Sequence, residues 1–245
     1  MRSRLYSVIS VLFFAILYTY TAIGVLIVLI LAWLKMKKPI KVISQIWAKS
    51  IFLLMGKKFE VHGIEKIKKN ERYILVANHS SLFDIVAIVS FYPGISWFGH
   101  ERLLKIPVFG NILRMMDYVP FKEPSYKNTR KMIDQLIDKS QSNTIAMFPE
   151  GTRTLNGKIS TFYRGFIYIY RTRDLEILPV TLNGFYDLKP KNRNYINFGS
   201  KLGVVIHDPI KKEALADKTD NEIIATVKGI IESAYSNNQL NKNER

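Results

Sequence analysis

The sequence predicts an α/β domain, built as a mixed sheet flanked by helices, that follows an N-terminal membrane-associated helical module. Short apolar runs bounded by polar or turn residues indicate buried strands. Stretches of helical pattern alternate with these runs, which favours a parallel or mixed sheet. A long uncharged apolar segment precedes them all. We therefore expect a membrane-anchoring module over residues 1–56 and one globular domain over 57–245.

The apolar segment runs from Leu5 to Leu34 without a charged residue. A helix crosses a bilayer with about 20 residues, so this segment is long enough. It exceeds the apolar core of a signal peptide, which has about 7–15 residues, and it lacks the polar stripe of a surface helix in a soluble protein. We expect it to span the bilayer once, or to enter one leaflet and turn near Gly24.

Basic residues flank this segment unevenly. Arg2 and Arg4 precede it, whereas four lysines follow it, namely Lys35, Lys37, Lys38 and Lys41. The more basic flank of a membrane segment stays in the cytoplasm. The sequence therefore predicts a protein of the inner (cytoplasmic) membrane, with its globular domain on the cytoplasmic side.

A second helical pattern begins at Pro39 and ends at Gly56. Lys41 and Lys49 lie off its apolar stripe, which consists of Ile40, Ile43, Trp47, Ile51 and Leu54. Two interpretations fit an amphipathic helix at this place. The helix lies on the membrane surface, or it packs on the globular domain.

Composition limits the kinds of site that the chain offers. Its 245 residues include no cysteine, which excludes disulfides, thiolate nucleophiles and cysteine-based zinc sites. The formal net charge of +16 attracts polyanions, of which nucleic acids and anionic lipid headgroups are the common ones. Nucleic-acid binding requires basic residues interleaved with exposed aromatic ones. Only residues 189–198 offer a modest cluster of this kind, so we expect no nucleic-acid partner.

Four short apolar runs in the globular domain predict strands, and they are YILVA at 73–77, TIAMF at 144–148, EILPVTL at 176–182 and KLGVVIH at 201–207. Helical patterns cover about 82–91, 102–116 and 126–140. A final amphipathic helix follows Thr219 and Glu222, which have the spacing of a capping box.

The first candidate site follows the strand at 73–77, where His79 and Asp84 are five positions apart. Five residues of a regular helix rotate about 140°, so the two side chains meet only if His79 lies in the preceding loop. Ser81 is a good N-cap and Asp84 follows it at the third helical position, which predicts that arrangement. Two interpretations fit these residues. Asp84 serves only as a helix cap, or it orients His79 as a general base.

The second candidate site is the loop from Pro149 to Arg153, which follows the strand at 144–148. Gly151 allows the backbone to approach a ligand closely, and the planar fork of Arg153 suits a phosphate. Glu150, at the end of the strand, is a candidate acceptor for a substrate hydroxyl. A surface turn without function would explain the same residues.

Both sites belong to a set of four ordered blocks that resembles the glycerolipid acyltransferases, and above all the lysophosphatidic acid acyltransferases (1-acyl-sn-glycerol-3-phosphate acyltransferases). The first block is Asn-His-x-x-x-x-Asp at 78–84 and the third is Phe-Pro-Glu-Gly-Thr-Arg at 148–153. The second block is similar through Leu103, Ile106, Pro107 and Gly110, and the fourth is centred on Pro179. The resemblance covers roughly Val61 to Pro209.

Two basic residues stand where the resemblance implies phosphate contacts. Many relatives carry an arginine at the end of the second block, and Lys122 is nearest to that place. A lysine keeps the charge but not the planar fork. The basic residue before the glycine of FYRGF, at 162–166, is Arg164.

The resemblance implies a catalytic domain over 57–245 that transfers a fatty acyl group to the sn-2 hydroxyl of lysophosphatidic acid and yields phosphatidic acid. The donor is a thioester of coenzyme A or of acyl carrier protein, and no metal or other cofactor is expected. His79 is the expected general base, oriented by Asp84, while Arg153 and Lys105 hold the acceptor's phosphate. Because cysteine is absent and no serine needs to be a nucleophile, direct attack by the acceptor is expected.

Backbone N–H groups of the Glu150–Thr152 loop, including Gly151, or near Asn78 are the expected oxyanion donors. Two alternatives stay open from the sequence. One is the same chemistry on another acceptor, such as glycerol 3-phosphate, another lysophospholipid or an ornithine lipid precursor. The other is a membrane-anchored polyanion-binding protein without enzymatic activity.

Overall fold

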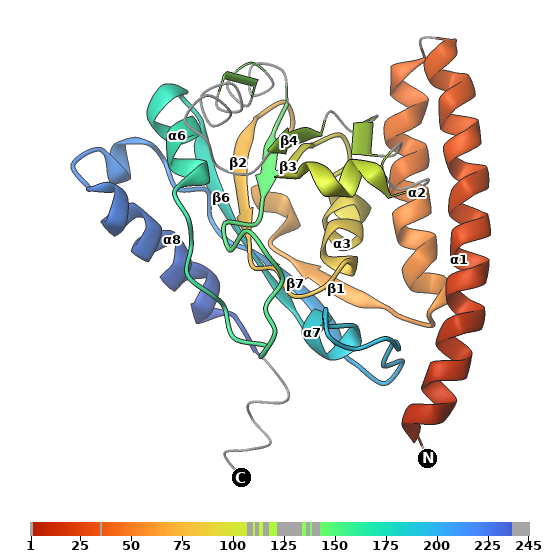
Figure 1. Ribbon diagram of the computed structural model, residues 1–245. Coiled ribbons are helices and arrows are strands. Elements are labelled where there is room, and N and C mark those ends of the chain that lie inside the picture. The colour runs from red at the N-terminus through yellow and green to blue at the C-terminus, as the bar shows by residue number, and fades with distance from the viewer. Residues whose placement is uncertain are drawn as a thin grey trace.

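The computed structural model describes residues 2–34, 36–106, 110, 113–114, 118–121, 134–135, 138 and 143–236. Over these residues the fold is the predicted mixed α/β sheet flanked by helices, with a long apolar helix at the N-terminus (Figure 1). The sheet has seven strands in the order β1-β7-β6-β2-β5-β3-β4. Their bounds are β1 Phe59–His62, β2 Tyr73–Ala77, β3 Ser96–His100, β4 Val119–Phe121, β5 Ile145–Met147, β6 Glu176–Asn183 and β7 Leu202–Ile206.

Helices connect the strands and precede them. The described α-helices are α1 Arg2–Trp33, α2 Lys37–Leu54, α3 Phe83–Phe91, α6 Gly165–Thr172, α7 Phe185–Leu188 and α8 Asp220–Ser233. Short 3₁₀ turns occur at η1 Ile64–Lys66, η2 Glu101–Lys105 and η3 Glu213–Leu215.

Strand β2 lies near the middle of the sheet and pairs in parallel with both β5 and β6. Every residue of β2 is buried, as expected for a strand whose two faces are both covered by helices. Strands β6 and β7 pair antiparallel, which makes the sheet mixed. Because β2, β5 and β6 run in one direction, the segments that follow Ala77, Met147 and Asn183 meet at one edge of the sheet.

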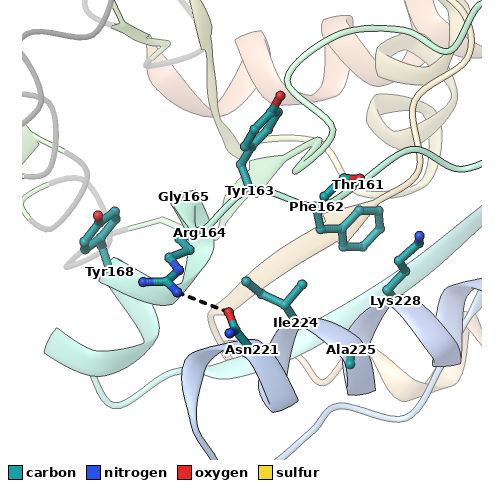
Figure 2. Close-up of a pocket in the computed structure, with 10 residues that line it drawn as sticks. All are labelled: Thr161, Phe162, Tyr163, Arg164, Gly165, Tyr168, Asn221, Ile224, Ala225 and Lys228. Atoms are coloured by element: carbon teal, nitrogen blue, oxygen red, sulfur yellow. Dashed lines mark hydrogen bonds between the residues drawn. The ribbon is translucent and has the colours of Figure 1, made fainter.

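Helices α6 and α8 cover one face of the sheet (Figure 1). Phe166 of α6 and Val227 of α8 are fully buried there, against Val76 of β2. The two helices are also joined at the surface, where Arg164 donates a hydrogen bond of 3.1 Å from Nη2 to Oδ1 of Asn221 (Figure 2).

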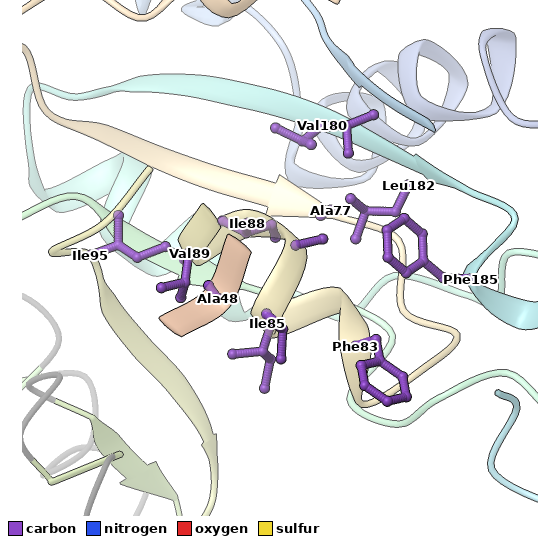
Figure 3. Packing of buried hydrophobic residues seen from close by; sticks show 14 of the residues in the cluster. Ala48, Ala77, Phe83, Ile85, Ile88, Val89, Ile95, Val180, Leu182 and Phe185 are labelled. Atoms are coloured by element: carbon purple, nitrogen blue, oxygen red, sulfur yellow. The ribbon is translucent and has the colours of Figure 1, made fainter. Parts of the chain in front are cut away.

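Helices α2 and α3 cover the opposite face of the sheet (Figure 1). Ile88 and Val89 of α3 pack with Ala48 of α2 and with Leu182 of β6 in a continuous apolar cluster (Figure 3). Since α3 begins directly after the loop that carries His79, this packing holds the start of the helix in place beneath that loop.

The N-terminal module is a pair of long helices that lie side by side (Figure 1). Helix α1 continues without interruption through Gly24, so the turn that was one of two expectations there is not formed. Two hydrogen bonds tie the helices together, Tyr20 Oη to Ser50 Oγ at 2.8 Å and Trp47 Nε1 to Thr21 Oγ1 at 3.2 Å. By length and composition, Leu5–Leu31 of α1 is able to cross a membrane.

Helix α2 packs on the globular domain, which is one of the two interpretations of its apolar stripe. Its buried face includes Ala48, Ile51 and Phe52, whereas the predicted stripe member Leu54 is 52% exposed. The buried face of α2 thus includes Phe52 in place of Leu54, because α3 and the sheet contact that side of the helix. Lys41 and Lys49 are exposed, as expected.

The expected strands are confirmed, with β5 shorter at both ends than the predicted 144–148. The last helix begins with the predicted capping box, in which Thr219 and Glu222 each accept a hydrogen bond from the other's backbone N–H. The pattern at 102–116 begins as the 3₁₀ turn η2, and most of the pattern at 126–140 lies outside the described residues. The sequence patterns did not predict β1, β3 and β4.

Candidate active site

The two candidate loops meet at the edge of the sheet where β2 and β5 end. Val76 of β2 is in register with Met147 of β5, so the segments that follow both strands leave the sheet side by side. His79 O accepts a hydrogen bond of 2.9 Å from Thr154 N, which ties the first loop to the second. Residues that are 75 positions apart in the chain thus form a single site.

His79 and Asp84 contact each other directly, with Nδ1 and Oδ2 separated by 2.8 Å. The same carboxylate oxygen accepts the backbone N–H groups of Ser80 at 2.6 Å and Ser81 at 2.8 Å. Asp84 is completely buried, and its Oδ1 atom has no hydrogen-bond partner within the described part of the chain. The spacing of the two residues predicted this contact, and the structure confirms it.

The start of α3 differs in detail from the predicted Ser81 cap. The helix begins at Phe83 with Leu82 as its N-cap residue, and Ser81 Oγ donates instead to Lys189 O at 2.8 Å. Half of the capping arrangement is present, because the Asp84 carboxylate accepts from Ser81 N. The predicted serine cap is wrong by one position, because the helix begins at Phe83 after Leu82, and Ser81 Oγ accepts only a long hydrogen bond of 3.4 Å from Phe83 N.

The imidazole ring of His79 is held on its flat side as well. It stacks on Phe148 with a centroid separation of 3.9 Å and an interplanar angle of 8°, and Trp97 stacks behind Phe148 at 5.6 Å. The His79 side chain is 15% exposed. Since Nδ1 faces Asp84, Nε2 is the ring nitrogen that remains to exchange a proton with a substrate.

Glu150 joins the two loops from inside the protein. Its Oε1 atom accepts from His79 N at 2.6 Å, and its Oε2 atom accepts from Ser160 N at 2.8 Å. Burial raises the pKa of the Glu150 carboxyl, and the two backbone hydrogen bonds partly counteract that rise. Both oxygens are used within the protein, which departs from the expectation that Glu150 accepts from a substrate hydroxyl. Its carboxylate positions the backbone of His79.

Asn78 has a similar positioning role. Its buried side chain accepts from Leu182 N at 2.7 Å and donates to Leu182 O at 3.0 Å. The amide thereby continues the pairing of β2 with β6 by one residue beyond Ala77. The side chain is committed to this pairing, so Asn78 serves as a positioning residue and not as a side-chain oxyanion donor.

Gly151 and Arg153 lie in the turn after Glu150. Gly151 has φ of +67°, a conformation in which glycine is favoured, and its N–H donates to Phe148 O at 3.1 Å. That N–H therefore closes the turn. Arg153 is half-buried, and burial lowers the pKa of its guanidinium while the Asp84 charge raises it. Because Thr154 N donates to His79 O, the neighbouring Arg153 lies in the turn that adjoins the His79–Asp84 pair.

The basic segment 189–193 contacts the site, although no motif of the sequence assigned it there. Lys191 Nζ donates to Thr152 Oγ1 at 3.3 Å, and Thr152 itself is exposed. Burial and the neighbouring charges of Arg153 and Arg193 lower the pKa of Lys189. The signal that points to this segment is its high density of basic residues shortly after β6, a strand that pairs with β2.

The remaining predicted phosphate contacts are Lys105, Lys122 and Arg164. Lys105 is exposed at the end of η2, and Lys122 lies outside the described residues. Arg164 is exposed and points toward Asn221 of α8, where it borders a groove of about 690 Å³ between α6 and α8 (Figure 2). The structure therefore does not bring Arg164 into contact with the His79–Asp84 pair. Within the described ranges no group of three or more His, Asp or Glu side chains is arranged to hold a metal ion.

The sequence and the fold of this chain are similar to those of known acyltransferases. The chain is 30% identical over 188 residues to the chloroplastic 1-acyl-sn-glycerol-3-phosphate acyltransferase BAT2 of Brassica napus. The matched region covers 74% of this chain and 54% of that protein. It is 31% identical over 156 residues to the 1-acyl-sn-glycerol-3-phosphate acyltransferase of Borreliella burgdorferi, with 63% of this chain and 61% of that protein covered. The chain spans about half the length of BAT2 and of the chloroplastic 1-acyl-sn-glycerol-3-phosphate acyltransferase LPAT1 of Arabidopsis thaliana, 54% and 52% respectively.

Among solved structures, the fold is similar to that of the 1-acyl-sn-glycerophosphate acyltransferase PlsC from Thermotoga maritima. The TM-score is 0.81 at 27% sequence identity, and the match covers 95% of this chain and 94% of that one. The acyltransferase family model matches residues 58–183, which is just over half of the 245 residues and includes the strands from β1 to β6. This chain, with its His79–Asp84 pair at the end of β2, belongs to the acyltransferase family.

Proposed function

We propose that this protein is a 1-acyl-sn-glycerol-3-phosphate acyltransferase of phospholipid biosynthesis. It transfers a fatty acyl group from acyl-CoA or acyl-ACP to the sn-2 hydroxyl of lysophosphatidic acid and produces phosphatidic acid. The observation that carries this proposal is the 2.8 Å contact between His79 Nδ1 and the buried Asp84 carboxylate, with the charge of Arg153 close by. The names of the similar proteins support the same acceptor.

In the proposed reaction, Nε2 of His79 removes the proton from the acceptor hydroxyl as its oxygen attacks the thioester carbonyl. A C–O bond forms, the tetrahedral intermediate collapses, and the C–S bond breaks. The proton then passes from the imidazolium to the leaving thiolate, so the ring returns to its neutral form. Asp84 stabilises the imidazolium while it exists and holds the tautomer with Nε2 unprotonated in the resting state.

The oxyanion of the intermediate needs hydrogen-bond donors near the attacked carbonyl carbon. Because Gly151 N–H already donates to Phe148 O, we place these donors among the other backbone N–H groups of the loop at 150–152. Direct attack by the acceptor agrees with a chain that contains no cysteine. No covalent acyl-enzyme is proposed.

The N-terminal helices give the reaction a location. Large apolar side chains are exposed along α1, for example Val8, Leu12 and Leu26, which is compatible with association with a membrane. We propose the inner membrane, with the catalytic domain on its cytoplasmic side, because the basic residues after α1 exceed those before it. The net charge of +16 favours both anionic headgroups and an acidic carrier protein.

A direct assay tests the proposed function. Purified protein in mixed micelles receives radiolabelled lysophosphatidate and either acyl-CoA or acyl-ACP, and the lipid products are separated. We expect phosphatidate with at least one donor, and a loss of turnover of at least 100-fold in His79→Ala. A panel with glycerol 3-phosphate, other lysophospholipids and an ornithine lipid precursor identifies the acceptor. The proposal is refuted if neither donor yields phosphatidate, or if His79→Ala turns over at the wild-type rate.

A further inference from the structure

The segment that follows α7 touches both loops of the active site. Ser81 Oγ, from the loop that carries His79, donates to Lys189 O at 2.8 Å. Lys191 Nζ donates to Thr152 Oγ1 at 3.3 Å, and Asn192 Nδ2 donates to Leu155 O at 3.4 Å. The segment therefore lies over the turn that carries Arg153, although it belongs to none of the four sequence blocks that resemble the acyltransferases.

Positive charge gathers where this segment and the turn meet. Arg153, Lys189 and Arg193 are half-buried, and the pKa of Lys189 is lowered by burial first and then by the charges of Arg153 and Arg193. The charge of Asp84 opposes the lowering of the pKa of Arg153, and the charge of Asp187 opposes that of Arg193. In the described part of the chain, no carboxylate forms an ion pair with Lys189. Like charges held together away from water favour the binding of an anion between them.

The basic residues of the segment differ in what they already bind. Arg193 donates to the carbonyl oxygens of Asp187, Leu188 and Tyr195, and its guanidinium lies 4.9 Å from the Tyr195 ring, so it shapes the segment. Lys189 Nζ donates to the carbonyls of Pro190 and Arg193. An ammonium group has three donors, so one remains for a ligand. Lys191 is exposed, and among the described residues its ammonium group donates to the Thr152 hydroxyl alone.

The segment also contacts helix α1, the membrane-anchoring helix. Ile196 N donates to Ser10 Oγ of α1 at 2.8 Å, and this contact is buried. The Phe198 ring packs edge-on against Tyr6 and Phe13, with centroid separations of 6.1 and 6.0 Å. The segment 189–198 thus joins the exposed apolar helix to the active site. Its lysines therefore lie between the residues that contact α1 and the turn that carries Arg153.

We propose that Lys189 and Lys191 complete the acceptor-phosphate site, so that the phosphate is held between these two ammonium groups and the guanidinium of Arg153. This inference rests on the proposed function and names residues that the family blocks do not contain. It also assigns to the segment 189–198 a second task, which is to set the position of the phosphate relative to the membrane helix. Arg193 keeps the segment in shape and does not touch the phosphate.

The test uses the full chain in mixed micelles and compares two acceptors that differ only in the phosphate, lysophosphatidate and monoacylglycerol. The variants are Lys189→Gln, Lys191→Gln and the double variant. Lys211→Gln is the matched control, since it removes the same charge from an exposed residue near Ile210, which pairs with Ile177 at the opposite end of the sheet. For each variant, KM and kcat are measured with a saturating thioester donor, and the melting temperature is recorded.

A hydrogen bond to a charged group contributes about 1.5–3 kcal/mol, so we expect the KM for lysophosphatidate to rise about 10-fold or more in Lys189→Gln and further in the double variant. In the Lys189→Gln, Lys191→Gln and double variants, the kcat with lysophosphatidate and the rate with monoacylglycerol should stay within about twofold of wild type. All parameters of Lys211→Gln should also stay within about twofold. Lys189→Arg should recover part of the affinity that Lys189→Gln loses. An unchanged KM in the double variant overturns the inference. A loss that is equal for both acceptors also overturns it, because it would show a structural role.

Failure of the proposed function gives a different result. In that case the wild type does not acylate lysophosphatidate with either donor, and the inference is then judged by binding alone. Thermal stabilisation by lysophosphatidate micelles, relative to monoacylglycerol micelles, is compared between wild type and the double variant. Weaker stabilisation of the double variant supports the phosphate site, and equal stabilisation refutes it.

Discussion

Asp84 receives three hydrogen-bond donors on one carboxylate oxygen, and the imidazole Nδ1 of His79 is one of them, at 2.8 Å. The other two are backbone N–H groups of the loop between the two residues. Because the carboxylate is buried and the ring also stacks on Phe148, the orientation of His79 is set before any substrate binds. Preorganisation of this kind makes the pair sensitive to small changes.

Replacing Asp84 by Asn tests the role of the carboxylate. The amide has nearly the same shape but no charge, so it neither stabilises an imidazolium nor enforces the tautomer with Nε2 unprotonated. We expect kcat to fall by about 10²–10⁴-fold while KM for both substrates changes little. Steady-state kinetics with lysophosphatidate and the preferred thioester donor measure this effect. A kcat close to that of wild type in a folded Asp84→Asn protein would exclude the proposed pair.

Arg153 is expected to act on binding and not on the chemical step. Its neighbour Thr154 is bonded to His79 O, and within the described part of the chain no carboxylate forms an ion pair with the Arg153 guanidinium. Arg153→Ala should raise the KM for lysophosphatidate by about 10–100-fold, which corresponds to one or two charge-assisted hydrogen bonds. Arg153→Lys should recover only part of this loss, because a lysine is not bidentate. A KM ratio of one between wild type and Arg153→Ala would remove Arg153 from the phosphate site.

Asn78 should matter for stability as well as activity. In Asn78→Ala the backbone N–H and carbonyl of Leu182 lose their partners in a place that water does not reach. Each unpaired buried group costs about 1–3 kcal/mol, so the unfolding free energy should fall by about 2–4 kcal/mol. Chemical denaturation followed by tryptophan fluorescence measures the change. Lys211→Gln again serves as the control, and an Asn78→Ala protein as stable as wild type would contradict the assigned role.

The lowered pKa of His207 leads us to expect that the free energy of unfolding depends on pH. Burial and the charge of Lys66 lower its pKa, against the opposing effect of Asp208, and its Nε2 lies 2.8 Å from Thr181 Oγ1. Thr181 donates its own proton to Ile231 O, so the ring must donate to the hydroxyl. Since the folded pKa is below the unfolded value of about 6.5, the stability is fully present above that pH and is lost as the pH falls through the folded pKa.

Melting temperatures at pH 8 and at pH 5.5 should therefore differ more for wild type than for His207→Gln, which has no titrating group at this position. Groups other than His207 act equally in both proteins, so the difference between the two pH dependences isolates its contribution. Identical pH dependences in the two proteins would show that His207 does not control this part of the stability.

Much of the fold followed from local pattern, and the exceptions have a common cause. Strands β2, β5 and β6 are buried on both faces and read as continuous apolar runs. Strand β1 lies at one edge of the sheet, where its residues alternate between partly buried and exposed, and β4 lies at the other edge. These edge strands have only four and three residues, FEVH and VPF, which are too few to show a clear periodic pattern. Strand β3 contains Gly99 and ends in His100, which weakens its pattern in the same way.

The sequence by itself determined that a long apolar helix precedes an α/β domain, and that His79 and Asp84 meet across the start of a helix. Both conclusions depend on residues near one another in the chain, where periodicity and capping geometry act. Only the tertiary structure decided that Glu150 holds the backbone of His79 and that the segment 189–198 joins α1 to the active site. These contacts depend on the order of the strands, which is set by long-range pairing and burial. No local pattern records that order, and residues 189–193 therefore look like an ordinary solvated loop until β6 is placed beside β2.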